Sequence, residues 1–237
     1  MKAIVLAAGL GTRMGSLTAS LPKPLLDVGG EPLLAHQLAR LARAGVAEIV
    51  VNVARFGDKI RERIGDGARW NVSVTYSDEG DVPLETGGGI LRALPLLGPD
   101  PFLVVNADAL TDFDPASLRL DGADGALLLV PNPDHNPRGD FALDAQGFVR
   151  PTGPKLTYGG TALLTPSLFA GCAPGAQPLK PILDAAIARG ALRGTRYEGY
   201  WIDVGTPERL DRARGRAAAR SSDPRAAASA TAPARSE

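Results

Sequence analysis

The stretch MKAIVLAAGLGTRMGSLTASLPKPLL, residues 1–26, decides the fold of this chain. Residues 3–8 are continuously apolar and too few for an independent helix, which predicts a parallel strand covered on both faces. Gly9 and Gly11 follow, and we expect them to let the backbone turn sharply and approach a ligand closely. Consecutive backbone N–H groups in such a turn form a concave anion site. The stretch therefore predicts a strand that ends in an anion-binding loop.

Two cations accompany this loop, Arg13 and Lys23. The planar guanidinium of Arg13 suits phosphate oxygens, and Lys23 adds a point charge on a segment stiffened by Pro22 and Pro24. The glycine spacing, G-x-G-x-x-x-G, is neither that of a dinucleotide fingerprint nor that of a P-loop, whose lysine follows its last glycine directly. We therefore predict a phosphate site of another kind. A strand-to-loop turn with incidental surface cations is the alternative.

The composition narrows the classes of function. Basic and acidic residues are balanced at 26 each, so no overall charge favours nucleic acid or an anionic membrane. The one cysteine, Cys172, excludes an internal disulfide and a multi-cysteine zinc site. With no signal-peptide pattern and no run of about 18 apolar residues, we expect a cytoplasmic protein without a membrane span. The oligomeric state is left open, with a monomer favoured.

Strand and helix patterns alternate along the chain. Leucines at 34, 38 and 41 predict a helix that opens at Pro32 and stops at Gly45. Further strands are expected over 49–53, 72–76, 102–105, 127–130, 141–143, 148–149, 156–164 and up to residue 204, and further helices over 58–64, 88–97, 182–188 and from Pro207. This alternation predicts an α/β fold with a mostly parallel sheet, helices on both faces, and ligands beyond the C-terminal ends of the strands.

A family resemblance rests on these motifs. LAAGLGTRMGSLT followed by LPKPLL resembles the signature loop of the sugar-1-phosphate nucleotidyltransferases, which make nucleotide sugars from a nucleoside triphosphate. The resemblance covers about residues 1–215 and implies a three-layer, Rossmann-like (GT-A-like) domain with a mixed, mostly parallel central sheet. The tail over 216–237 lacks an apolar period, and we expect it to be disordered. The implied partners are a nucleoside triphosphate and a sugar 1-phosphate, with no nucleic acid and no membrane.

The resemblance also implies roles for individual residues. Arg13 would grip the triphosphate, Lys23 would contact the reacting phosphates, and the loop backbone would hold the base. The nucleotide-binding residues that it implies are Ala7, Ala8, Gly9, Gly11, Thr12, Arg13, Glu85, Thr86 and Gly87. The sugar-binding residues that it implies are Asn106, Arg138, Gly139, Asp140, Gly159 and Gly160, with Gly159 and Gly160 leaving room for the sugar. Without the resemblance, the glycine cluster Gly87–Gly89 is equally well interpreted as a flexible hinge.

Two aspartates lie near the ends of predicted strands. Asp108 follows the buried strand over 102–105, and Asp203 lies in the run WIDVGT. Each is also typical of a helix cap, a solvated turn or a buried structural carboxylate. The resemblance to the family motifs N-x-D and W-x-D-x-G-T implies that both bind Mg²⁺, which needs only one or two carboxylates when substrate phosphates supply further oxygens. Asp112 and Asp114 are nearby carboxylates that could compete for the metal.

One motif of the family is missing. Many relatives carry a Glu-Lys-Pro turn that gives a lysine to the sugar phosphate, whereas residues 150–155 here read RPTGPK. Lys155 or Arg138 could substitute as the sugar-side cation. His36 and His135 have no nucleophile or ligand at motif spacing, so we assign them no role.

The combined motifs are most similar to those members of the family that transfer a uridylyl group to N-acetylmuramate 1-phosphate in cell-wall recycling. This likeness implies formation of UDP-N-acetylmuramate with release of pyrophosphate. Guanylyl transfer to mannose or heptose 1-phosphate is the alternative. A non-catalytic regulator that binds nucleotide sugars is the rival from another class, and the presence of Lys23, Asp108 and Asp203 argues against it.

Overall fold

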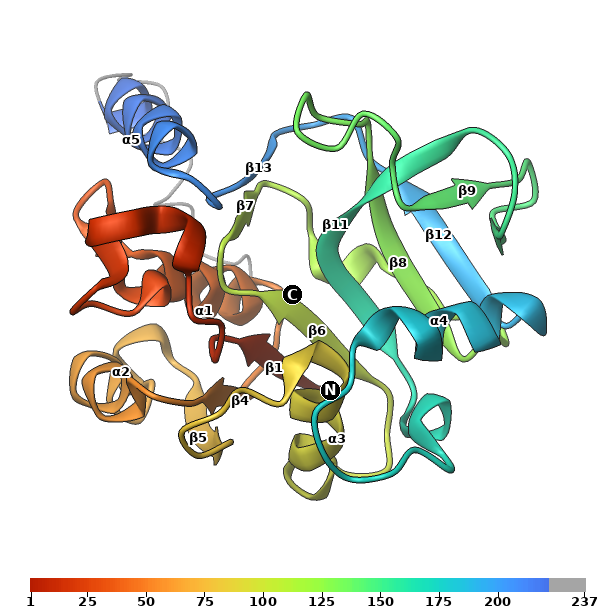
Figure 1. Ribbon diagram of the computed structural model, residues 1–237, viewed down its shortest axis with the longest axis horizontal. Helices are drawn as coiled ribbons and strands as arrows, with labels where there is room; N and C mark the ends of the chain where they lie inside the picture. The colour runs from red at the N-terminus through yellow and green to blue at the C-terminus, as the bar shows by residue number, and fades with distance from the viewer. Residues whose placement is uncertain (222–237) are drawn as a thin grey trace, which may run out of the picture.

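A mixed β-sheet runs through the centre of the structure, a computed structural model that describes residues 1–221 (Figure 1). Four neighbouring strands of this sheet are parallel, in the order β6-β1-β4-β5. Their bounds are Lys2–Leu6 for β1, Glu48–Val53 for β4, Ser73–Asp78 for β5 and Phe102–Asn106 for β6. The C-terminal ends of these strands lie at one edge of the sheet, and the glycine loop and Asp108 directly follow β1 and β6 there.

The second half of the chain extends the sheet with antiparallel strands. The long strand β11 pairs antiparallel with β6, β8 and β9, while β12 runs parallel to β8. The bounds are Gly125–Val130 for β8, Phe141–Leu143 for β9, Val149–Arg150 for β10, Lys155–Leu164 for β11 and Leu192–Arg196 for β12. The short strands β7 (Ala109–Thr111) and β13 (Trp201–Asp203) form a separate antiparallel pair, as do β2 (Asp27–Val28) and β3 (Glu31–Pro32).

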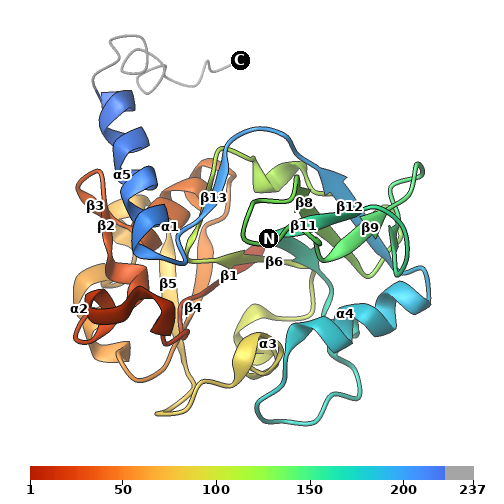
Figure 2. The same ribbon diagram turned by 45° about the horizontal axis from the view of Figure 1, so that its top comes forward.

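Helices cover both faces of the sheet. Helices α1 (Leu33–Arg43) and α2 (Gly57–Ile64) share one apolar core, and α3 (Glu85–Leu97) and α4 (Leu179–Ala188) share the other, along the opposite side of the sheet in Figure 2. Successive residues of β1 alternate between these cores, with Val5 in the first and Ile4 in the second. The predicted three-layer α/β fold with a mixed central sheet is confirmed.

Local sequence signals explain where the helices begin and end. As predicted, α1 begins after Pro32 and stops before Gly45, whose φ is +79°. Helix α3 continues through Pro95, because a proline in the last turn removes only one intrahelical hydrogen bond. The short 3₁₀ turns cover Thr12–Thr18, Lys23–Leu25, Ala68–Trp70, Pro115–Ser117 and Pro166–Phe169.

The domain boundary expected after residue 215 is wrong. Helix α5 runs from Pro207 to Ser221, and its Leu210 and Ala213 pack against Met14 of the glycine loop in a third apolar cluster. The remainder of the predicted tail, residues 222–237, lies outside the described part of the chain. Within residues 1–221, no helix combines the length and apolar character that crossing a membrane requires.

Candidate active site

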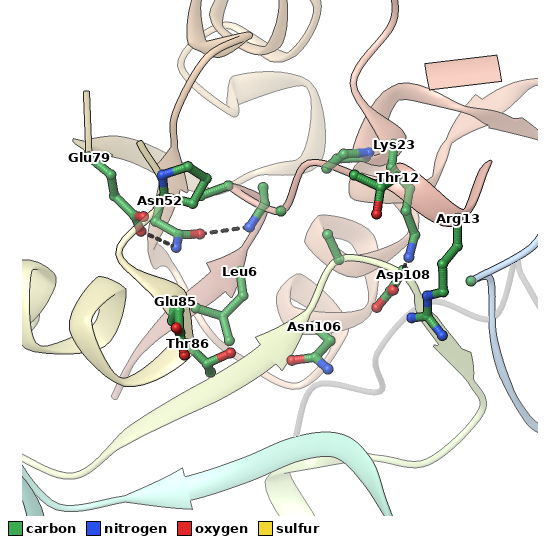
Figure 3. A pocket seen from close by; sticks show the side chains of 18 residues that line it. Leu6, Thr12, Arg13, Lys23, Asn52, Glu79, Glu85, Thr86, Asn106 and Asp108 are labelled. Atoms are coloured by element: carbon green, nitrogen blue, oxygen red, sulfur yellow. Dashed lines mark hydrogen bonds and ion pairs between the residues drawn. The ribbon is translucent and has the colours of Figure 1, made fainter. Parts of the chain in front are cut away.

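Three adjoining cavities open at the C-terminal edge of the parallel strands. The loop cavity, about 340 Å³, lies between the glycine loop, β6 and the start of α3 (Figure 3). The side cavity, about 500 Å³, lies between α3, α4, β9 and β11, and the carboxylate cavity, about 310 Å³, contains Asp108 and Asp203. Asn106, at the end of β6, lines all three. The cavities therefore form one continuous site, and the predicted Asn106 stands at their junction.

The predicted nucleotide-binding residues of the glycine loop all line the loop cavity; they are Ala7, Ala8, Gly9, Gly11, Thr12 and Arg13. Gly11 has a φ of +64°, and a Cβ there would lie 3.1 Å from Cβ of Lys23. The positive φ and this close approach favour glycine at position 11. The carbonyl of Gly11 accepts a hydrogen bond of 2.9 Å from Oγ1 of Thr18. Gly9 differs, because its φ is not positive and a Cβ would meet no atom within 4 Å. The sharp turn is therefore at Gly11, and the space beside Gly9 is open.

The two predicted cations lie on either side of Asp108 in Figure 3. Lys23 Nζ forms an ion pair with Oδ2 of Asp108, and this lysine side chain is only 12% exposed. Arg13 is exposed and, within residues 1–221, forms no ion pair, so its guanidinium is free to bind an anion. The site thus offers one unpaired cation and one that is paired with a carboxylate.

The two predicted metal ligands lie on neighbouring chain segments. The backbone N–H of Val204 donates to the carbonyl of Asp108 at 2.8 Å, and both aspartate side chains line the carboxylate cavity. Oδ1 of Asp203 lies 2.9 Å from Nη1 of Arg209 and 3.1 Å from Nε2 of His135. His135 therefore lines this cavity as well, although no sequence motif pointed to it. Its loop has no periodicity, and its partner is far along the chain.

The donor set of the carboxylate cavity fits a hard cation. Oδ1 of Asp203 is buried and receives no well-aligned hydrogen bond from the described residues, which leaves lone pairs for another ligand. Residues 1–221 contain no group of three or more His, Cys, Asp or Glu that could hold a metal. A pair of carboxylates is enough for Mg²⁺, which can take its other oxygens from phosphates and water, and Asp108 and Asp203 provide such a pair.

The competing carboxylates are used elsewhere. Asp112 accepts a hydrogen bond from the hydroxyl of Tyr197, and burial together with this contact raises the pKa of Tyr197 to about 12. Asp114 accepts a hydrogen bond of 2.9 Å from the backbone N–H of Ala116. Neither aspartate lines any of the three cavities. Asp114 is therefore a suitable control position for mutations at the predicted metal site.

The second glycine cluster is neither a hinge nor a row of free N–H groups. Glu85 and Thr86 line the loop cavity as predicted, but Gly87 is buried and does not. The N–H of Gly88 donates to the carbonyl of Gln177 at 3.0 Å, and a Cβ on Gly88 would lie 2.2 Å from the carbonyl oxygen of Gly175. The cluster thus lets α3 pack tightly against the segment before α4. Glu85 has a φ of +58°, a strained conformation that is enriched at functional sites.

A buried polar connection that the sequence analysis missed joins the glycine loop to α3. Asn52, at the end of β4, accepts a hydrogen bond of 2.6 Å from the N–H of Ala7 and donates one of 2.6 Å to Oε1 of Glu79. Oε2 of Glu79 accepts a hydrogen bond of 2.6 Å from the N–H of Leu84. Asn52 and Glu79 also line the loop cavity. The one sequence signal was a polar residue inside the apolar run IVVNV.

We expect Asn52→Leu to lower the free energy of unfolding by about 2–3 kcal/mol, because it leaves the N–H of Ala7 and a buried carboxylate oxygen of Glu79 without partners. Urea denaturation followed by circular dichroism measures this loss. The double variant Asn52→Leu/Glu79→Leu is the control and should lose less than the sum of the two single changes. Additive losses would show that the two side chains do not act together.

The residues predicted to bind the sugar are divided between cavity walls and the core. Asp140 lines the side cavity, where its Oδ2 accepts a hydrogen bond of 2.8 Å from the N–H of Tyr158. Gly160 lines the carboxylate cavity at a φ of +71°, and a Cβ there would lie 2.9 Å from Nδ2 of Asn106. Gly159 does not leave room for a sugar, because its Cβ would face the core, 2.9 Å from Cγ of Leu128.

The two cations predicted for the sugar side do not line the cavities. Arg138 and Lys155 are exposed and line none of the three cavities. Gly139 forms a turn at a φ of +61°, packed against Asn132 and Lys155, and does not line the cavities either. Lys180, at the start of α4, lines the side cavity instead.

Comparison with known proteins identifies the family. The model of the family described as nucleotidyl transferase matches residues 2–139. This chain belongs to the nucleotidyl transferase family. The matched part contains the glycine loop, Lys23, the start of α3 and Asp108. Asp203, Lys180 and most residues of the side cavity lie beyond the matched part, so the family match covers mainly the residues that line the loop cavity.

Relatives of this nucleotidyl transferase match over nearly the whole chain. It is 45% identical over 229 residues to the N-acetylmuramate alpha-1-phosphate uridylyltransferase of Neisseria meningitidis serogroup B, covering 92% of this chain and 99% of that protein. It is 37% identical to the protein of the same name from Caulobacter vibrioides, covering 87% and 92%. Among solved structures, HddC from Yersinia pseudotuberculosis in complex with GMP-PN superposes with a TM-score of 0.74 and 25% identity, covering 91% of this chain and 98% of that one.

Proposed function

We propose that this nucleotidyl transferase is Mg²⁺-dependent and joins UTP to N-acetylmuramate 1-phosphate, forming UDP-N-acetylmuramate and pyrophosphate. The observation that carries the proposal is the meeting of the three cavities at Asn106, which lets a nucleotide and a sugar phosphate be held end to end. The choice of uracil and of the muramyl sugar is supported by the two uridylyltransferases at 45% and 37% identity. The reaction would take place in the cytoplasm as a step of cell-wall recycling. The protein would act as a monomer.

In this mechanism an oxygen of the sugar phosphate attacks the α-phosphorus of UTP in line, and pyrophosphate leaves from the opposite side. The P–O bond to pyrophosphate breaks as the new P–O bond forms, so no covalent enzyme intermediate is needed. Positioning and stabilisation of charge then supply the catalysis. The glycine loop would hold the nucleotide, Arg13 would stabilise the leaving pyrophosphate, and Lys23 would offset charge at the reacting phosphates.

Asp108 and Asp203 would hold the Mg²⁺. When bound, the ion would neutralise part of the phosphate charge. The ion pair between Lys23 and Asp108 keeps the lysine directed into the site before the substrates arrive. Arg209 and His135, at 2.9 and 3.1 Å from Oδ1 of Asp203, would hold this carboxylate in place.

Pyrophosphate release measured across a panel of substrates tests the proposal. The panel combines UTP, GTP, CTP and dTTP with the 1-phosphates of N-acetylmuramate, glucose and mannose. We expect the highest kcat/KM for UTP with N-acetylmuramate 1-phosphate, and poor turnover of GTP and of glucose 1-phosphate. A preference for GTP with mannose 1-phosphate would replace the assignment with a guanylyltransferase. Release from no pair would favour a regulator that binds nucleotide sugars.

We expect Arg13→Lys to lower kcat/KM by about 10- to 100-fold, because lysine keeps the charge but cannot bind two phosphate oxygens with a planar fork. Steady-state kinetics with UTP as the varied substrate measure the loss. Arg63→Lys, on the exposed side of α2, is the matched control and should behave like the parent protein. Parental kinetics in Arg13→Lys would remove this residue from the site.

A further inference from the structure

The proposed substrate carries a charge that the sugar site must accommodate. N-acetylmuramate differs from N-acetylglucosamine by a lactyl ether whose carboxylate is ionised at neutral pH. A carboxylate that leaves water without a partner is strongly disfavoured. An enzyme that selects this sugar therefore needs a cation on its sugar side.

Lys180 is the one basic residue among those that line the side cavity. Its Nζ lies 5.5 Å from the ring centroid of Phe141, on the wall of the cavity. Much of the remaining wall is apolar and suits the methyl groups of the acetamido and lactyl substituents, with Phe141, Tyr158, Pro178, Leu179 and Leu183. The cavity therefore combines an apolar wall with a single ammonium group.

The side cavity also contains acidic residues, whose negative charge a bound acidic sugar would have to overcome. Asp140 already accepts hydrogen bonds from the N–H of Tyr158 at 2.8 Å and from Nδ2 of Asn136 at 3.1 Å. Its negative charge, with that of Glu85, repels an acidic sugar unless a cation compensates. Arg138 and Lys155 do not line the cavity, so within residues 1–221 Lys180 is the cation placed to do so.

The stability of α4 does not explain a lysine at this position. Lys180 lies in the first turn of the helix, which contains no acidic residue, and there the helix dipole disfavours a positive charge. Its partner Asp184, with oxygens 2.8 and 2.7 Å from Nζ, follows four residues later, which is the less favourable order for such a pair. Both side chains are largely exposed, at 61% and 49%, so a substrate carboxylate can replace Asp184 readily.

The chain holds Lys180 in a fixed relation to the nucleotide side. The N–H of Gln177 donates to the carbonyl of Leu84 at 3.0 Å, and the N–H of Gly88 donates to the carbonyl of Gln177 at 3.0 Å. These bonds tie the segment before α4 to the start of α3, where Glu85 and Thr86 line both the loop cavity and the side cavity. Lys180 is therefore built into the same rigid frame as the nucleotide site.

From this arrangement we propose that Lys180 is a specificity-determining residue, whose ammonium group binds the lactyl carboxylate of N-acetylmuramate 1-phosphate. The inference rests on the proposed function and deepens it. It assigns the choice of an acidic sugar to one side chain on α4. The catalytic groups Arg13 and Lys23 lie in other cavities and contribute nothing to this choice.

The test compares two sugar phosphates that differ only in the lactyl group. With UTP, kcat/KM is measured for N-acetylmuramate 1-phosphate and N-acetylglucosamine 1-phosphate in the parent protein and in Lys180→Met. We expect a loss of about tenfold on the muramyl substrate alone, mainly through KM, because a contact made equally in ground and transition states affects binding. Lys180→Glu should lose more, and Lys180→Arg should recover most of the preference. Lys155→Met and Arg138→Met are the matched controls and should keep it.

The outcomes separate this inference from the proposed function. A parent protein that prefers the muramyl substrate, with an unchanged preference in Lys180→Met, would overturn the role of Lys180 and leave the function standing. A parent protein without any preference for the lactyl group would overturn both. A thermal unfolding midpoint like that of the parent shows that Lys180→Met is folded, and an equal loss on both sugars would indicate a structural role only.

Discussion

Asp108→Asn should lower kcat for the reaction of UTP with N-acetylmuramate 1-phosphate by about 10³-fold, the upper end of the effect of removing one charge-stabilising group from an active site. Asparagine keeps the shape of the side chain but removes the charge that would hold Mg²⁺. It also leaves the ammonium of Lys23, only 12% exposed, without its partner. Activity measured against Mg²⁺ concentration should show that more metal restores part of the rate.

Asp114→Asn is the matched control for this prediction. Asp114 caps a 3₁₀ turn through the N–H of Ala116, and asparagine caps such turns about as well as aspartate. The control should retain parental activity and parental metal dependence. Near-parental kcat in Asp108→Asn, with the same Mg²⁺ dependence, would show that Asp108 is not a metal ligand.

Asp203→Asn should also be inactive, but it is less easily interpreted. Arg209 is buried, at 8% exposed, and pairs with Asp203, so the substitution leaves an uncompensated cation inside the protein. Removing one partner of a buried pair costs about 3–5 kcal/mol. Urea denaturation must therefore accompany the kinetics of this variant.

Lys23→Met should lower kcat by about 10²–10³-fold, because it removes a largely buried cation that, in the proposed mechanism, would offset charge at the reacting phosphates. Methionine keeps most of the apolar length of the side chain, so the packing of Gly11 against Lys23 is preserved. We expect the affinity for UTP, measured by calorimetry, to change much less than kcat. An affinity loss as large as the loss in kcat would assign Lys23 to ground-state binding only.

The control for this variant is Lys2→Met, at the opposite end of β1 from the glycine loop. Lys2 pairs with Glu48 on the surface at 3.1 Å, and exposed pairs contribute little to stability. Its replacement should leave both kcat and affinity for UTP unchanged. A similar loss in both lysine variants would indicate a general effect of charge on the protein.

The parts of the site that are local in the sequence could be predicted. The glycine loop and Asp108 each follow a buried strand directly, and parallel strands bring their C-terminal ends to one edge. The hydrogen bond between Asn52 and Glu79 could not be predicted, because Asn52 lies on β4 and Glu79 follows β5, with α2 between them in the chain. The same holds for His135, which reaches Asp203 from a loop without periodicity.

Gly159 shows how a local pattern can mislead. A regular strand alternates its side chains between two faces, and neighbouring glycines in a strand suggested space for a ligand. Because of this alternation two neighbouring glycines cannot both open onto one cavity, although the register of β11 against β8 also shifts between Tyr158 and Ala162. Gly160 then faces Asn106 and the cavities, while Gly159 faces Leu128 in the core. Lys180 could not be singled out from the sequence either, since only the packing of α4 shows which of its side chains line the side cavity.

The central claim is that the three joined cavities transfer a uridylyl group to a sugar 1-phosphate. Mass spectrometry of a reaction containing the protein, UTP, N-acetylmuramate 1-phosphate and Mg²⁺ tests it most directly, with released pyrophosphate counted in the same sample. We predict the mass of UDP-N-acetylmuramate, in equal amount to pyrophosphate, and neither product when one substrate is omitted. Pyrophosphate or phosphate released from UTP without the sugar phosphate, and no product of that mass, would contradict the account.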